Sequence, residues 1–283
     1  MSASRIAIII PHYDDHDRLG RCLAALAPQI GAGDEVVVVD NASPRRPHVP
    51  EGVRLVVEAE KGAAVARNRG VAETVAPVLL FLDCDCVPAR DWLATARGLA
   101  ERADLIGGTV TVFDESPPPR SGAEAFETVF AFDNRGYVER KGFSVTANLL
   151  THRKVLDTIG GFRPGLSEDL EWCRRATAAG YRLVHEEAIR VAHPTRRDWP
   201  ALEKKWRRLT EETWGLGRQD ARGRALWAAR ALAMPLSIPA HAPRVLRHPD
   251  LAPREKARAL STLARLRLRR AGWMLAQAAG RGI

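Results

Sequence analysis

The chain has 283 residues and a formal net charge of +9, with 46% hydrophobic and 27% charged residues. These values exclude a wholly disordered chain, and the length suits one large domain or one domain with an appendage. Its four cysteines (Cys22, Cys84, Cys86 and Cys173) are too few for a disulfide scaffold, which favours a reducing compartment. No apolar run reaches the length of a secretory signal or of a membrane span, so neither is expected.

Strand-like and helix-like segments alternate through the N-terminal part of the chain. The predicted strands are Arg5–Ile10, Glu35–Val39, Val53–Val57, Val78–Leu82 and Leu105–Phe113, and the predicted helices are 19–26, Gly62–Val75 and Trp92–Ala103. This alternation predicts an α/β fold with a mostly parallel sheet covered on both faces. Such sheets bind ligands beyond the carboxyl ends of their strands, so a site is expected after Ile10, Val39 and Leu82.

The C-terminal part is predicted to be mainly helical. Residues 121–140 fit either a helix or a loop; strands are expected at Phe143–Leu150 and Tyr181–Val184, and helices at His152–Ile159, Ser167–Ala179, Asp198–Trp214, Arg222–Ala233 and Pro253–Ala279. Residues 196–283 hold 20 Lys and Arg against 7 Asp and Glu, a balance of +13, whereas residues 1–195 have a balance of −4. This asymmetry predicts that the tail binds an anionic surface, either a membrane or a nucleic acid.

Two carboxylates follow the predicted strand Val78–Leu82. Asp83 and Asp85 are two residues apart, so in an extended segment their side chains point the same way. Paired carboxylates suit Mg²⁺ or Mn²⁺, whereas the alternative is a solvated turn. The interleaved Cys84 and Cys86 have poor spacing for zinc and are expected to be small packed side chains.

Three further polar positions have both a structural and a functional interpretation. Acids at Glu168 and Asp169 after Ser167 suit the first turn of a helix, and either carboxylate could also serve as a general base. Arg67 fits a surface helix or a contact with a diphosphate. His193 could be a metal ligand or simply a packed histidine.

Eight short segments occur in order along residues 5–215. They are 8–14 (IIIPHYD), 37–43 (VVVDNAS), 61–70 (KGAAVARNRG), 81–88 (FLDCDCVP), 146–153 (TANLLTHR), 160–162 (GGF), 168–172 (EDLEW) and 179–183 (AGYRL). Each segment is weak by itself. In this order and at these spacings, together they resemble the inverting glycosyltransferases of family 2, which have the GT-A fold.

The resemblance implies a role for each candidate residue. Pro11, Tyr13 and Asp40 would hold the nucleobase and ribose of a nucleotide-sugar donor, and Arg67 would lie near the base or the diphosphate. Asp83 would contact the nucleotide and share with Asp85 and His193 the binding of a divalent cation, Mg²⁺ or Mn²⁺. Asp169 would be the catalytic base, with Glu168 as its rival. Asn41 departs from the family, in which many members have an acid.

The implied activity is metal-dependent, inverting transfer of one sugar from a nucleotide sugar to an acceptor hydroxyl. UDP is the expected nucleotide because it is the commonest in the resembled family, and the acceptor would be a glycan or a lipid-linked molecule. The chain lacks the Gln-x-x-Arg-Trp motif of processive synthases. Two alternatives remain: an α/β nucleotidyltransferase that makes a nucleotide sugar, and a nucleic-acid-binding protein that acts through the basic tail, although no specific recognition module is visible.

The expected organisation is a GT-A domain over residues 1–215 and a basic helical extension over residues 216–283. Within the extension, Pro253–Ala279 has Leu263 and Met274 on one face and Arg258 and Arg265 on the other. Such a helix either lies on anionic lipid or packs on the catalytic domain with its arginines in water. The expected location is cytoplasmic, with peripheral association with the inner face of the membrane under the first alternative.

Overall fold

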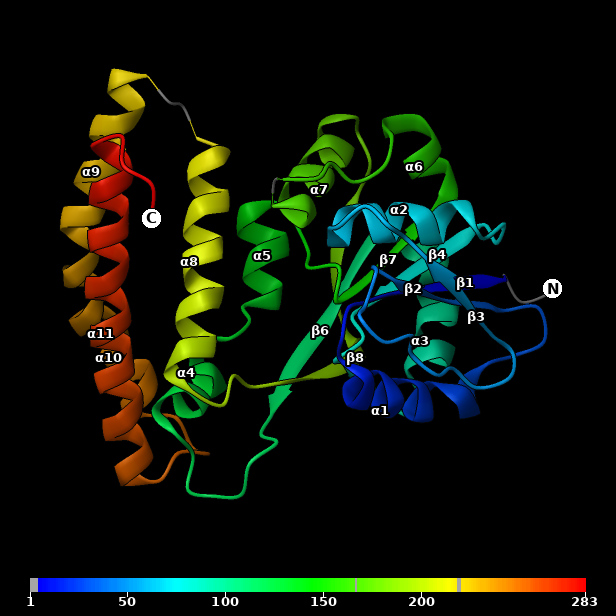
Figure 1. The fold of residues 1–283 in the computed structure, drawn as a ribbon, viewed down its shortest axis with the longest axis horizontal. Helices are drawn as coiled ribbons and strands as arrows, with labels where there is room; N and C mark the ends of the chain where they lie inside the picture. The colour runs from blue at the N-terminus through cyan, green and yellow to red at the C-terminus, as the bar shows by residue number, and fades with distance from the viewer. Residues whose placement is uncertain (1–4, 166, 218–219) are drawn as a thin grey trace. The chain divides into compact units, whose positions relative to one another are not determined.

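A computed structural model describes residues 5–165, 167–217 and 220–283 (Figure 1). The chain forms two compact units. The first, here called the sheet unit, comprises the chain up to Thr111 together with Asp133–His193; the second, the helical unit, comprises Val112–Phe132 and Pro194–Ile283. The functional boundary expected at residue 215 stays a prediction.

One sheet of eight strands organises the fold. Its strands are β1 (Ile6–His12), β2 (Glu35–Asp40), β3 (Val53–Val57), β4 (Val78–Leu82), β5 (Val87–Pro88), β6 (Leu105–Phe113), β7 (Asn148–His152) and β8 (Leu183–Pro194), in the order β3-β2-β1-β4-β7-β6-β8-β5. Strands β3, β2, β1 and β4 are parallel, whereas β7 runs antiparallel to both β4 and β6, and β5 antiparallel to β8. The predicted α/β fold is confirmed.

Helices cover both faces of the parallel strands. Helices α2 (Ala63–Ala72), α6 (Arg153–Ile159) and α7 (Glu168–Ala178) lie on one side, and α1 (His16–Leu26) and α3 (Trp92–Leu99) on the other (Figure 1). Strand β1 is apolar up to Pro11, as expected for a strand that is covered on both faces. Helix α2 lies so close to this strand that a Cβ at Gly70 would be 2.4 Å from Cγ2 of Ile9, so only glycine fits there.

An aromatic cluster fixes the position of α7. Trp172 is fully buried, and its ring lies 5.1 Å from that of Phe162, which in turn lies 5.1 Å from Phe81 of β4. The Trp172 indole donates a hydrogen bond to the carbonyl of Gly160 at 3.0 Å. Ser167 occupies the N-cap position of α7 but makes no side-chain capping bond. Packing of the buried tryptophan therefore holds this helix start in place.

Several predicted elements differ in extent from the structure. The expected strand Tyr181–Val184 is instead the longer β8, whose charged exposed side chains alternate with buried ones such as Ile189 and Val191 and hide its apolar pattern. The expected strand Phe143–Leu150 is wrong at its start, because β7 begins only at Asn148. The ambiguous residues 121–140 lie mostly in two helices, α4 (Gly122–Phe130) and α5 (Asn134–Lys141).

The helical unit is assembled around one long helix. This helix is α11 (Pro253–Ala278), and the other elements are α4, α8 (Trp199–Gly215), α9 (Ala221–Ala233), η3 (Met234–Leu236) and α10 (Ser237–Leu246). Leu263 and Leu266 of α11 pack against Phe126 of α4 and Leu202 of α8, and Met274 packs against Trp227 of α9. Most of the apolar face of α11 is thus covered by helices of the same unit, while Leu275 is 39% exposed.

The four cysteines are free thiols, three of them buried. Burial raises the pKa of the Cys86 thiol well above its usual value, as it does for Cys84, and the neighbouring Asp85 raises it further. This supports the expectation that these thiols are packed, protonated side chains. Among the described helices, none combines the length and the hydropathy needed to cross a bilayer.

Candidate active site

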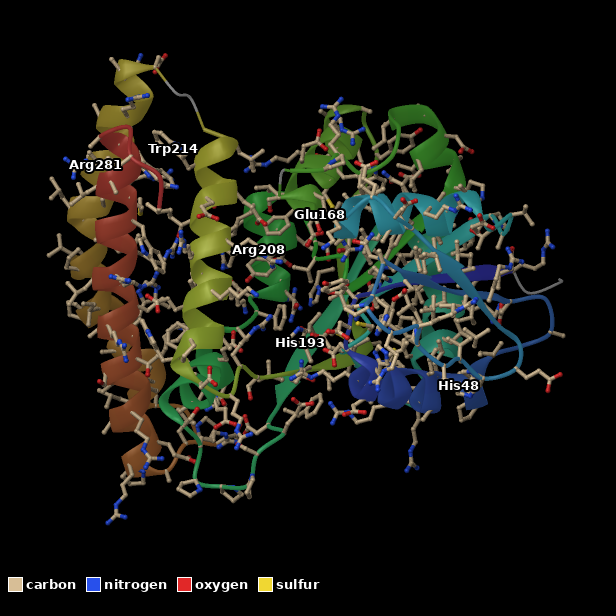
Figure 2. The ribbon with its side chains drawn as sticks, viewed as in Figure 1. His48, Glu168, His193, Arg208, Trp214 and Arg281 are labelled. Carbon is tan, nitrogen blue, oxygen red and sulfur yellow. The ribbon has the colours of Figure 1, made fainter. Side chains whose placement is uncertain are left out.

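The predicted site residues all belong to the sheet unit. They lie at the carboxyl ends of β1, β2 and β4, on α2, at the start of α7 and at the end of β8, and Figure 2 labels Glu168 and His193. The parallel register of the first strands sets which of these side chains lie beside one another.

The ends of β1 and β2 are joined through their side chains. The parallel register places His12 beside Asp40, and Nδ1 of His12 lies 2.9 Å from Oδ1 of Asp40, with both side chains buried. The Ser43 hydroxyl donates to the same carboxylate oxygen and accepts a bond from the backbone N–H of Asp14 at 2.8 Å. The sequence pointed to Asp40 but missed His12 and Ser43, which orient it.

The two loops that follow β1 and β2 contain unusual backbone conformations. Asp14 and Ala42 have φ values of 48° and 57°, the left-handed region that residues with a Cβ seldom adopt. Such conformations persist only where the surroundings impose them, and they are concentrated at functional sites. Tyr13, which precedes Asp14, is 51% exposed, and Nζ of Lys61 lies 5.6 Å from the centre of its ring. An exposed ring beside a cation is suited to stacking on a planar ligand.

Asn41 holds the loop that precedes α2. Its amide nitrogen donates to the carbonyls of Glu58 and Glu60 at 3.1 and 2.6 Å, and its oxygen accepts from the N–H of Gly62 at 2.7 Å. Gly62 has φ of 138°, a conformation that favours glycine. A carboxylate could not donate either of the two bonds to carbonyls, so the departure of Asn41 from the family pattern has a structural reason here.

Arg67 of α2 joins two acids that come from different elements. Its guanidinium donates from Nη2 to Oδ1 of Asp83 at 2.7 Å and from Nη1 to Oε1 of Glu168 at 2.9 Å. The Arg67 side chain is buried, and its Nε has no partner within the described part of the chain. The nearby carboxylates hold the pKa of Arg67 above its usual value even though burial alone would lower it. Arg67 is therefore a fixed cation between the end of β4 and the start of α7.

The short pairing of β5 with β8 brings Asp85 to His193. In this antiparallel ladder Val87 lies opposite Ala192, so the residues preceding β5 run alongside the end of β8. Nε2 of His193 lies 3.1 Å from Oδ2 of Asp85, and the histidine is 6% exposed. The structure thus brings together two residues that lie far apart in the sequence and that the resemblance assigned to one cation.

Asp85 and His193 together supply two of the ligands that a divalent cation needs. Within residues 5–165, 167–217 and 220–283, no group of three His, Cys, Asp or Glu side chains is arranged to hold a metal ion. Mn²⁺ or Mg²⁺ could be bound by this carboxylate and this imidazole when a nucleotide is present. Phosphate oxygens and water would then fill the other coordination positions of the ion. Asp83 is committed to Arg67, and its role as a direct ligand stays a prediction.

The two candidate bases at the start of α7 have different surroundings. Glu168 is bonded to Arg67, whereas Asp169 accepts a hydrogen bond from the Thr146 hydroxyl at 2.8 Å. Burial raises the pKa of Asp169 to about 7; the adjacent Glu168 raises it further, and Arg67 opposes the shift. A base whose pKa lies near the working pH accepts protons most effectively. This difference favours Asp169 over Glu168 as the proton acceptor.

The chain matches the family model for glycosyl transferase family 2 over residues 7–171. Among curated proteins it is 29% identical over 221 residues to glycosyltransferase AglE of Haloferax volcanii, covering 71% of each chain. It is 28% identical over 214 residues to the pre-mycofactocin glycosyltransferase of Mycobacterium tuberculosis, covering 69% of this chain and 44% of that protein.

Solved structures share the fold at low sequence identity. One of them is the mannosyltransferase PcManGT of Pyrobaculum calidifontis, in complex with GDP-Man and Mn²⁺. The match has a TM-score of 0.56 and 19% sequence identity, and it covers 100% of this chain and 77% of that chain. TarS of S. aureus, in complex with UDP-GlcNAc, has a TM-score of 0.54 and 15% identity, with coverages of 98% and 92%.

Fold and site together define an enzyme of the glycosyltransferase class with the GT-A fold. The family match extends over more than half of the chain and includes every predicted site residue except His193. The chain belongs to glycosyltransferase family 2.

Proposed function

We propose that this protein transfers one sugar, with inversion at the anomeric carbon, from a nucleotide sugar to the hydroxyl of a glycan or lipid-linked acceptor. The observation that carries this proposal is the pair of hydrogen bonds by which Arg67 joins Asp83, at the end of β4, to Glu168, at the start of α7; this arrangement is called the Arg67 clasp. Glu168 is the neighbour of Asp169, the carboxylate whose pKa is raised. Donor-binding and base-bearing elements thereby meet in one place. The family membership excludes the alternative of a nucleotidyltransferase.

The donor would lie across the ends of β1, β2 and β4. Asp40, oriented by His12 and Ser43, would accept hydrogen bonds from the nucleoside, and the exposed ring of Tyr13 would stack on the base. Pro11 lies one residue before His12 at the end of β1. UDP is the nucleotide we expect, and the complexes of PcManGT with GDP-Man and of TarS with UDP-GlcNAc make a donor of this chemical class a reasonable inference.

A divalent cation, Mn²⁺ or Mg²⁺, would be held by Asp85 and His193, with Asp83 nearby. Such an ion neutralises the negative charge that develops on the departing diphosphate. The presence of Mn²⁺ in the PcManGT complex supports a metal in this family. Arg67, held by Asp83 and Glu168, would be a fixed positive charge close to the diphosphate.

Asp169 would take the proton from the acceptor hydroxyl as that oxygen attacks the anomeric carbon. The carboxylate is held in one orientation by Thr146, so its second oxygen is left to face the acceptor. The bond from the anomeric carbon to the diphosphate breaks on the opposite side, which inverts the configuration. No covalent enzyme intermediate is required, and a positioned base of this kind contributes about 10²–10⁴-fold to the rate.

A donor panel tests this function. The purified protein is incubated with UDP-, GDP- and dTDP-sugars, Mn²⁺ and a set of sugar and lipid-phosphate acceptors, and release of the nucleoside diphosphate is recorded. We expect acceptor-dependent release from at least one donor, abolished by a chelator and restored by Mn²⁺. Release of pyrophosphate in place of a nucleoside diphosphate, or release that a chelator leaves unchanged, would contradict the proposal.

A further inference from the structure

Large apolar side chains are exposed mainly on the helical unit. Among the described residues, nine large hydrophobic side chains are exposed, and six of them lie between residues 226 and 275. Four of them are Leu226, Leu232, Leu236 and Leu246, each between 54% and 73% exposed, and they belong to the consecutive elements α9, η3 and α10. These four residues are called the leucine face below.

The leucine face is the outward side of helices whose inward side is already packed. On α9, Trp227 and Ala231 are buried against Met274 of α11, and the Trp227 indole donates to Gln277 at 3.0 Å. Of the exposed residues of α9, Ala221, Ala225, Leu226, Ala229, Leu232 and Ala233 are apolar, and Arg222, Arg224 and Arg230 are basic. Helix α9, η3 and α10 run along α11 one after another (Figure 1). Their exposed apolar residues therefore do not serve the packing of this unit.

The formal charges within the segment that carries the leucine face, between Asp220 and Asp250, are of one sign. Residues 221–249 contain five arginines, two histidines and no aspartate or glutamate. Arg222, Arg230 and Arg247 are exposed and have no carboxylate partner within the described part of the chain. Exposed leucines flanked by unneutralised arginines are the composition of a surface that lies in the interface of an anionic bilayer.

We infer that the leucine face of α9, η3 and α10 docks on a membrane surface that contains anionic lipid. The leucines would enter the boundary between headgroups and acyl chains, and the arginines would contact lipid phosphates. Nucleic acid supplies phosphates but no apolar phase for the leucines. A second copy packed on the same face by two-fold symmetry would bring its five arginines against five others, which repel. The docking surface is separate from the proposed transfer reaction, since its residues belong to the helical unit and the candidate site to the sheet unit.

Co-sedimentation of the full chain with vesicles tests this docking. We expect the protein to sediment with phosphatidylcholine vesicles that contain phosphatidylglycerol, to stay largely in the supernatant with phosphatidylcholine alone, and to be released by added salt. The variant L226S/L232S/L236S should lose about tenfold or more in partitioning. The control Val75→Ser, at a residue 70% exposed in the sheet unit, should partition like the original protein.

A second variant separates charge from apolar contact. R222Q/R230Q/R247Q should bind the two kinds of vesicle equally weakly, and unchanged circular dichroism should show that both triple variants fold. Equal sedimentation of the leucine variant and the original protein would overturn the inference. Two further results would also overturn it. In the first, the protein does not bind vesicles but binds DNA through the arginines; in the second, it does not bind vesicles but forms a dimer that the leucine substitutions dissociate.

Discussion

Replacing Asp169 with asparagine is expected to lower kcat by about 10²–10⁴-fold and to leave donor affinity almost unchanged. Asparagine keeps the shape of the side chain and can still accept the bond from Thr146, but it cannot take a proton at neutral pH. Steady-state rates of nucleoside diphosphate release, together with donor binding by calorimetry, measure the two effects separately.

The pH dependence of the original protein gives this prediction a second readout. Burial raises the pKa of Asp169 to about 7, and the reactive form is the deprotonated one. Below a pH of about 7, kcat/KM should therefore rise by about tenfold for each pH unit, and above that pH it should be constant. The small residual activity of Asp169→Asn should lack this transition.

Glu168→Gln is the matched control for the base. Glu168 is adjacent in the sequence and is bonded to Arg67, so its replacement should weaken the clasp and reduce the rate less than replacement of Asp169. If Glu168→Gln abolishes turnover and Asp169→Asn retains it, the roles of the two acids are reversed.

Arg67→Met is expected to lower both stability and activity. It leaves Asp83 and Glu168 as neighbouring carboxylates without the cation that bridges them, and methionine fills much of the same volume. We expect the free energy of unfolding to fall by about 2–3 kcal/mol, less than for a fully buried pair because both acids are partly exposed. Because Arg67 lowers the pKa of Asp169, the acidic limb of the pH profile should move to higher pH.

Two further substitutions serve as controls for Arg67→Met. Arg69→Met removes an exposed arginine that pairs with Glu73 along the same helix, and should change stability by less than about 0.5 kcal/mol. Arg67→Lys restores the charge but cannot bond two carboxylates in the same fork, so it should recover only part of the loss. Equal melting temperatures for Arg67→Met and Arg69→Met would show that the clasp does not stabilise the site.

The parallel half of the sheet could be predicted because its strands are continuous apolar runs that end at polar residues. Asp40, Asp83 and Asp169 were visible in the sequence for the same reason, since each stands where an apolar or helical pattern begins or ends. The Arg67 bridge could not be predicted, because it depends on the distance between α2 and α7, which the aromatic cluster around Trp172 sets.

The tail shows the opposite case, in which the helix was predicted but the partner of its apolar face was not. The apolar pattern of Pro253–Ala279 predicted α11, but periodicity alone does not say which partner covers an apolar face. Helices α4, α8, α9 and α10 cover it, and the leucines left exposed are chiefly those of the preceding α9, η3 and α10. Those leucines lie among prolines and alanines, so they form no conspicuous pattern in the sequence.

The most direct test of the account is metal-dependent nucleotide binding to the original protein and to Asp85→Asn, measured by calorimetry with UDP and GDP. The account predicts that one of the nucleoside diphosphates binds in the presence of Mn²⁺, that binding falls about tenfold or more without the ion, and that Asp85→Asn binds with and without Mn²⁺ equally weakly. Tight, Mn²⁺-dependent binding that survives in Asp85→Asn would contradict it.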